Sequence, residues 1–290
     1  MSSRLIGLLA DAYGLRKNQI AVGNGSDEIL AFAFQAFGEK GLIFPDITYG
    51  FYPVWANLYG LDAKTVPLDA DYNVDVRDYR GNDRCVVIAN PNAPTGKALT
   101  VRELAGIVEG NPDQAVIVDE AYVDFGAESA LAFVPRYENV LVVRTFSKSR
   151  QLAGARLGFA MGHERLIEDL NRVRYSFHPY NVNSLTQAAG EAALMQPAYF
   201  EACRRAIIDT REWTQEQLKA LGFRVLPSQT NFLFAAAPGL CGAEYQKKLR
   251  EKNILIRYFD LPRTRDFVRI TIGTREQMQA LIRATKEIVQ

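Results

Sequence analysis

The sequence is poor in the residues that build metal sites and disulfide frameworks. It has three cysteines, Cys85, Cys203 and Cys241, which are odd in number and lie far apart, and two histidines, His163 and His178. The cysteines lack the paired spacing of zinc ligands, and a disulfide-stabilised domain would carry more of them. The composition therefore predicts a reduced, cytoplasmic protein without a structural metal site.

The chain also lacks an excess of either charge and a long apolar run. Its 34 basic and 33 acidic residues give a formal net charge of +1, which argues against nucleic acid or another polyanion as a partner. No apolar stretch approaches the roughly 20 residues that a membrane helix needs, and no export or anchoring signal is visible. The 290 residues suggest about two domains with ample length for a sizeable core.

One lysine follows an apolar run in an environment that suits covalent chemistry. The stretch from Val140 to Val143 has the pattern of a buried strand, and it ends at Thr145, Ser147 and Lys148 among several hydroxyl groups. A lysine after a strand is usually a solvated surface residue, so this stretch alone is weak evidence.

A second apolar run ends in a carboxylate and a phenol. Ala115 to Val118 reads as a strand, and Asp119 and Tyr122 follow it. Pyridoxal phosphate needs a lysine for its Schiff base, an acid facing its pyridine nitrogen and donors for its phosphate. The two strand ends together offer all three, although Asp119 could also cap a turn and Tyr122 could belong to the core.

Five ordered motifs carry a resemblance to a known family. They are GNGSDEI, NPNAPTG, VDEAYVDF, RTFSKSRQLAGARLGF and VRITIGT, and their order resembles that of histidinol-phosphate aminotransferases, which are fold-type I pyridoxal-phosphate enzymes. The match runs from about Ser3 to the C terminus. Members of this family carry several tens of further residues before the segment that opens this chain, and the resemblance implies that one wall of the site would come from them.

The resemblance implies an α/β fold. We expect a large pyridoxal-phosphate domain over residues 1–192, with a mainly parallel sheet flanked by helices, and a smaller C-terminal α+β domain over residues 193–290. Within the second domain we expect strands at Phe223–Val225, Asn231–Phe234, Ile254–Ile256 and Phe267–Ile270. The helix from Pro197 to about Leu221 carries many charges, and we expect most of them on a solvated face, among Arg204, Arg205, Asp209, Arg211 and Glu212.

The resemblance also implies roles for single residues. Lys148 would form the Schiff base and then act as general acid and base, Asp119 would keep the pyridine nitrogen protonated, and Tyr122 would donate to the ring oxygen. The ring of Tyr49 would stack on the pyridine, and Asn92 would share the ring oxygen and face the substrate. The phosphate would lie among Gly25, Ser26, Asp27, Thr145, Ser147 and Arg156. Each of these segments also has an ordinary reading as a capped helix, a core aromatic cluster or a proline-stiffened loop.

Two arginines of the second domain are the expected substrate residues. Arg269 lies in a buried-looking strand, where an unpaired cation is costly, so it requires an anionic partner. By resemblance, Arg269 and Arg257 bind the substrate phosphate or the carboxylate of the acceptor, with a structural salt bridge as the alternative for each. The implied reaction joins L-histidinol phosphate and 2-oxoglutarate in a cytoplasmic homodimer whose site lies near the subunit interface. An aromatic amino-acid aminotransferase and a cofactor-binding module without turnover remain alternatives.

Overall fold

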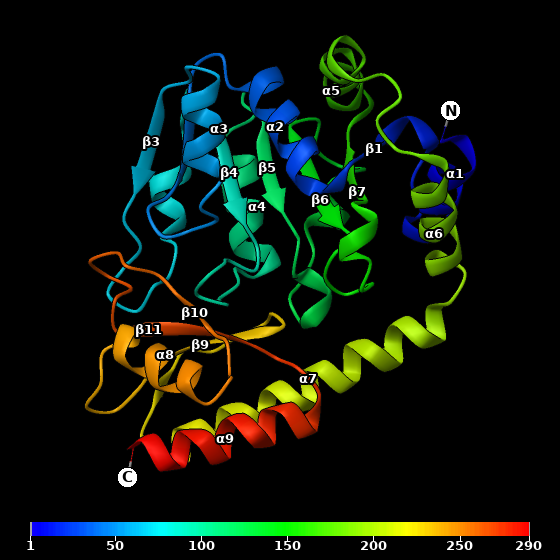
Figure 1. The fold of residues 1–290 in the computed structure, drawn as a ribbon. Helices are drawn as coiled ribbons and strands as arrows, with labels where there is room; N and C mark the ends of the chain where they lie inside the picture. The colour runs from blue at the N-terminus through cyan, green and yellow to red at the C-terminus, as the bar shows by residue number, and fades with distance from the viewer. Residues whose placement is uncertain (1, 290) are drawn as a thin grey trace.

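The computed structural model describes residues 2–289, which form two sheets joined by one long helix (Figure 1). The larger sheet and most helices come from the first two thirds of the chain. Helix α7 (Pro197–Ala220) runs from this part to the smaller sheet, where the C terminus also lies. Among the described residues no helix is both long and apolar enough to cross a membrane.

The larger sheet has seven strands in the order β1-β7-β6-β5-β4-β2-β3. Its strands pair in parallel except β7, which is antiparallel to both of its neighbours. The strands are β1 (Ile20–Gly23), β2 (Leu42–Pro45), β3 (Ala63–Val66), β4 (Cys85–Ala89), β5 (Val116–Asp119), β6 (Val140–Thr145) and β7 (Gly158–Gly162). The apolar runs of the central strands are buried throughout, as expected for a parallel sheet covered on both faces.

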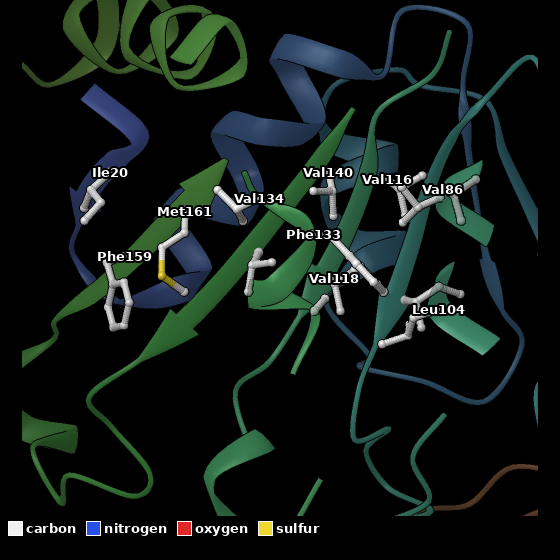
Figure 2. Packing of buried hydrophobic residues seen from close by; sticks show 14 of the residues in the cluster. Ile20, Val86, Leu104, Val116, Val118, Phe133, Val134, Val140, Phe159 and Met161 are labelled. Atoms are coloured by element: carbon white, nitrogen blue, oxygen red, sulfur yellow. The ribbon is translucent and has the colours of Figure 1, made fainter. Parts of the chain in front are cut away.

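Alternate residues of the central strands face two different helical layers. Val116 and Val118 of β5 pack in one core with α1 (Ser3–Tyr13) and α4 (Val101–Glu109), and Figure 2 shows part of this face. Ile117, between them, points to the other core, which contains α2 (Gly25–Phe37), α3 (Tyr52–Leu58) and α5 (Glu164–Phe177). By the same alternation, Asp119 lies on the face of Ile117, and Glu120 lies on the face of Val116 and Val118.

The smaller sheet is antiparallel, in the order β10-β11-β9-β8. Its strands are β8 (Arg224–Val225), β9 (Phe232–Ala236), β10 (Arg257–Tyr258) and β11 (Phe267–Thr271). One face packs on α7, α8 (Gly242–Glu251) and α9 (Arg275–Val289), and the other packs Phe234 and Phe267 against Ile47 and Tyr72 of the larger part. The expected strand at Ile254–Ile256 is wrong, because pairing begins only at Arg257, opposite Arg269.

Helix α7 follows α6 (Ser184–Leu194) and contacts elements of both parts. The boundary at residues 192 and 193 stays a prediction. Arg211 is an exception to the solvated face expected for this helix: its side chain is buried, and its guanidinium donates at 2.9 Å to the carbonyls of Phe125 and Thr230. These two carbonyls come from the larger and the smaller part, so Arg211 ties the helix to both.

Candidate active site

A cavity opens at the carboxyl ends of the parallel strands β4, β5 and β6. Open α/β sheets bind ligands at this edge, because the loops that leave neighbouring strands diverge there. Nine of the eleven residues expected to hold the cofactor line the cavity: Ser26, Asp27, Tyr49, Asp119, Tyr122, Thr145, Ser147, Lys148 and Arg156. The other wall residues are Ala89, Pro91, Ala93 and Ala121. Gly25 and Asn92 are outside the wall.

One end of the cavity has the features of an anion site. Helix α2 begins at Gly25, so its first backbone N–H groups and its dipole favour a negative charge there. The Arg156 guanidinium lies 3.4 Å from Ser147 Oγ and 3.2 Å from Asp27 Oδ2. Gly25 has a φ of +80°, and a Cβ atom at this position would lie 2.5 Å from Arg156 Nη2. The absence of a side chain at Gly25 therefore lets the guanidinium approach the helix N terminus.

Asp119 forms the buried floor of the cavity. Its carboxylate accepts a hydrogen bond from Tyr52 Oη at 2.8 Å and one from the backbone N–H of Ala121 at 3.1 Å. Burial raises the pKa of Asp119 to about 6, although both hydrogen bonds and the nearby Lys148 favour the ionised form. A cationic group bound against this carboxylate would offset the desolvation that burial imposes on it.

Tyr52 is a site residue that sequence reasoning missed, because Tyr49 alone was singled out from its aromatic segment. The signal available was proximity in sequence: Tyr52 begins helix α3 three residues after Tyr49, and its N–H donates to the Tyr49 carbonyl at 3.1 Å. Their rings meet edge to face at 5.6 Å. Tyr49 Oη donates to Asp27 Oδ1 at 3.0 Å, and burial raises the pKa of Tyr49, so the phenol stays protonated. The two tyrosines tie the anion end of the cavity to its acidic floor.

Lys148 and Tyr122 bring an amine and a phenol to the same cavity wall. The Lys148 ammonium lies over the Tyr122 ring, 5.3 Å from its centroid. Within residues 2–289 neither Lys148 Nζ nor Tyr122 Oη has a hydrogen-bond partner, and neither side chain is fully buried. Both donors are therefore available to a bound molecule.

The loop after β4 differs from the expectation. Asn92 is buried, and its amide nitrogen donates to the Ile47 carbonyl and to Thr95 Oγ1, while its oxygen accepts from Thr48 Oγ1 at 2.8 Å. These bonds stabilise the loop itself, and the neighbouring Ala93 lines the cavity in place of Asn92. The direct contact between Asn92 and a ligand stays a prediction that the observed hydrogen bonds do not favour.

Arg257 and Arg269 are neighbours in the smaller sheet but are outside the cavity wall. They are directly opposite in the β10–β11 ladder, and no ion pair joins either to an acid in the described residues. Arg269 stacks over Phe232 and Phe259 at 5.1 and 5.8 Å, and its buried Nε has no partner. Phe232 in turn contacts the Tyr122 ring edge to face at 5.1 Å. Arg269 is therefore a half-buried cation without an acidic partner, one aromatic layer from the cavity, whereas Arg257 is exposed.

Comparison with known proteins identifies the family. The model of "Aminotransferase class I and II" matches residues 3–284. The chain belongs to this family. It is 47% identical over 97% of its length to histidinol-phosphate aminotransferase 2 of Rhizobium meliloti, and 48% identical over 99% to histidinol-phosphate aminotransferase 1 of Bordetella parapertussis. The matches span 81% and 82% of those two proteins, so the chain covers about four fifths of their length.

A solved structure confirms the fold class predicted for this aminotransferase. The complex of histidinol-phosphate aminotransferase from Sinorhizobium meliloti with pyridoxal 5'-phosphate superposes with a TM-score of 0.89 at 24% identity, covering 99% of this chain and 81% of that one. The family relationship also confirms the resemblance inferred from the motifs and the prediction of pyridoxal phosphate as cofactor.

The residues present fit this cofactor. The unpartnered lysine amine, the buried Asp119 carboxylate and the anion site around Arg156 match its aldehyde, its pyridine nitrogen and its phosphate. The assignment of each residue to one of these groups is a proposal.

Proposed function

We propose that this aminotransferase transfers the amino group of L-histidinol phosphate to 2-oxoglutarate, giving imidazole-acetol phosphate and L-glutamate in histidine biosynthesis. The single observation that carries the proposal is the convergence of Lys148, Asp119 and the Arg156 anion site on one cavity. The names of the two bacterial relatives, at 47% and 48% identity, support the choice of substrate.

Pyridoxal phosphate, when bound, supplies an electron sink for the substrate carbon that loses its proton. Lys148 would hold the cofactor covalently, and its amine, once free, would move a proton to and from the substrate carbon. Asp119 would face the pyridine nitrogen and favour its protonated form, since a buried carboxylate needs a cationic partner. Tyr122, which lies beside Lys148, would donate to the ring oxygen.

Arg257 and Arg269 would give the enzyme its selectivity for anionic substrates. Both substrates of the reaction carry an anion, namely the phosphate of one and a carboxylate of the other. Two facing arginines without acidic partners suit both groups, because guanidinium forks bind phosphate and carboxylate alike. Contact between them and the substrate requires the bound molecule to extend from the cavity toward β11.

We further propose that two copies of the chain associate beside the cavity. Phe51 and Leu58 are 50% and 69% exposed on the outer side of α3, and Phe177, which packs against Phe32, is 63% exposed. The Phe51 ring stacks on Tyr49, which lines the cavity, so a partner that covers Phe51 would border the site. Light scattering should give a mass near twice 32.4 kDa, and a monomer at micromolar concentration would contradict this.

The proposal places the enzyme in the cytoplasm. Phosphorylated substrates do not cross a bilayer unaided, because moving an ion into hydrocarbon is very costly. Fractionation of cells that express the protein tests this, and recovery with the membrane fraction would argue against it.

Covalent capture of the cofactor tests the role of Lys148. The chain should gain the mass of one reduced cofactor after incubation with pyridoxal phosphate and borohydride, and Lys148→Ala should gain none. Lys40→Ala is the matched control, because Lys40 is exposed and outside the cavity. Full labelling of a folded Lys148→Ala protein would refute the assignment.

A further inference from the structure

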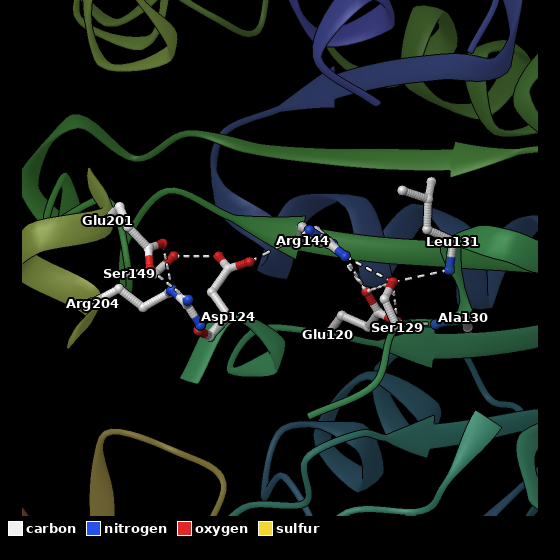
Figure 3. Close-up of polar contacts among 9 residues, drawn as sticks. All are labelled: Glu120, Asp124, Ser129, Ala130, Leu131, Arg144, Ser149, Glu201 and Arg204. Carbon is white, nitrogen blue, oxygen red and sulfur yellow. Dashed lines mark hydrogen bonds and ion pairs between the residues drawn. The ribbon is translucent and has the colours of Figure 1, made fainter. Parts of the chain in front are cut away.

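A chain of polar contacts lies beneath the active-site cavity, on the opposite face of the strands that form it (Figure 3). Glu120 and Arg144 follow the alternation of β5 and β6 onto this face, while Asp119 and Thr145 line the cavity. Arg144 Nη2 lies 2.8 Å from Glu120 Oε2, and both side chains are buried. Glu120 also accepts hydrogen bonds from Ser129 Oγ and from the Ala130 N–H. This ion pair fixes the ends of the two strands that carry the reacting groups.

The contact that concerns catalysis is between Ser149 and Asp124. Ser149 directly follows Lys148, and Asp124 is two residues beyond Tyr122. Ser149 Oγ donates to Asp124 Oδ2 at 2.5 Å, and Ser149 is only 2% exposed. A hydrogen bond from a buried hydroxyl to a carboxylate is stronger than one between neutral groups.

Asp124 is itself held from two sides. Its other carboxylate oxygen lies 3.5 Å from Arg144 Nη1, which connects it to the buried ion pair. Its backbone carbonyl accepts from Arg204 of α7 at 3.1 Å, and Arg204 pairs with Glu201 one turn earlier in that helix. The carboxylate is therefore a fixed point to which Ser149 attaches.

We propose that Asp124 is a positioning residue that acts through Ser149 to set the place of the Lys148 amine against Tyr122. Within residues 2–289, the Ser149–Asp124 contact is the hydrogen bond that directly joins the segment 146–151, which carries Lys148, to the segment 120–126, which carries Tyr122. Loss of this bond leaves the Lys148 segment without its direct hydrogen bond to the segment that carries Tyr122. The inference rests on the proposed function in that Lys148 is taken as the reacting amine.

The expected size of the effect follows from geometry. Displacing a reacting group by about 1 Å can lower a rate on the order of 100-fold, and a loosened loop samples the productive position for part of the time. We expect Ser149→Ala and Asp124→Ala each to lower the rate of the half-reaction with L-glutamate on the order of tenfold. The double variant should be no slower than the slower single variant, since both changes remove the same bond. Asp124→Asn keeps an acceptor oxygen and should lie closer to the unaltered protein.

The measurements are the single-turnover rate and the pH midpoint at which the absorbance of the lysine-bound cofactor changes. Both should move in Ser149→Ala and Asp124→Ala. Neither should move in Ser176→Ala, in which an exposed serine loses a hydrogen bond to the Arg172 carbonyl. Single variants with rates within twofold of the unaltered protein and an unmoved midpoint would overturn the proposal. Multiplicative rather than shared losses in the double variant would also overturn it.

Hydrogen exchange of the cofactor-free chain gives a second test that does not depend on activity. Backbone amides in 146–151 should exchange faster in both alanine variants and not in Ser176→Ala, with the rest of the chain unchanged. A folded Ser149→Ala protein that keeps its original exchange in this segment would refute the tether. If the unaltered chain turned over no amino donor, the proposed function would fail, while this exchange result would still decide whether Asp124 holds the Lys148 segment.

Discussion

Substitution of the acid under the cofactor should stabilise the empty protein while weakening the holoenzyme. Asp119 is 5% exposed and burial raises its pKa to about 6 from 3.8. In Asp119→Asn the group can no longer ionise, so the desolvation penalty of the charged form disappears. The cofactor should bind this variant less tightly, because the cationic pyridine nitrogen loses its counter-charge.

The sign and size of the stability effect follow from linkage. A carboxyl whose pKa is higher in the folded than in the unfolded state binds more protons when folded, so the free energy of unfolding falls as pH rises through the window between the two pKa values. A shift of about 2 units at about 1.4 kcal/mol each gives ~3 kcal/mol lost once Asp119 is fully ionised. About two thirds of this loss falls between about pH 4.5 and about pH 8.

Urea denaturation of the cofactor-free protein at these two pH values measures the effect. The advantage of Asp119→Asn over the unaltered chain should be about 2 kcal/mol larger at the higher pH. Asp83→Asn is the control, because Asp83 is exposed and forms no ion pair in the described structure. An advantage that is the same at both pH values would refute the argument that Asp119 is a strained, buried carboxylate.

Two further predictions concern the anion sites. Arg269→Ala should raise the KM for L-histidinol phosphate and for 2-oxoglutarate on the order of tenfold. Cofactor affinity should change little, because Arg269 is outside the cavity wall. Steady-state kinetics and cofactor titration test this, with exposed Arg265→Ala as the control, and equal losses of substrate and cofactor affinity would contradict it. Gly25→Ala should weaken cofactor binding on the order of tenfold, because its Cβ would displace the Arg156 guanidinium. Gly239→Ala is the matched control for Gly25, with a φ of +70° and no atom within 4 Å of the added carbon, and equal cofactor affinity in the two variants would count against the clash.

Much of the site could be predicted from the sequence. Strand periodicity indicated the buried strands, and the order of the motifs supported the resemblance that implied the site residues. The apolar runs before Asp119 and Lys148 indicated buried parallel strands, and parallel strands bring their carboxyl ends to one edge. The structure places these strands side by side, and the cavity forms at their carboxyl ends, beside Asp119, Lys148 and Ala89. The strand order itself was not visible in the sequence.

The remaining features depend on contacts between distant segments. Tyr52 has the local pattern of a core aromatic, and only the packing of α3 on the sheet brings its hydroxyl to Asp119, 67 residues away. Asn92 and Ala93 are adjacent, and the irregular loop decides which of them faces the cavity. Arg211 has the pattern of a solvated charge, yet carbonyls from both parts of the molecule enclose it. Composition and periodicity describe only local sequence, so they cannot predict these contacts between distant segments.

The most direct test of the account is the absorbance of the chain loaded with pyridoxal phosphate, recorded before and after addition of L-histidinol phosphate, with L-phenylalanine and L-glutamate in parallel. We predict that histidinol phosphate and glutamate convert the visible band of the lysine-bound cofactor to the near-ultraviolet band of its amine form, and that phenylalanine does so far more slowly. A band that responds to phenylalanine and not to histidinol phosphate would contradict the proposed substrate. A band that responds to no amino donor would contradict the proposed turnover.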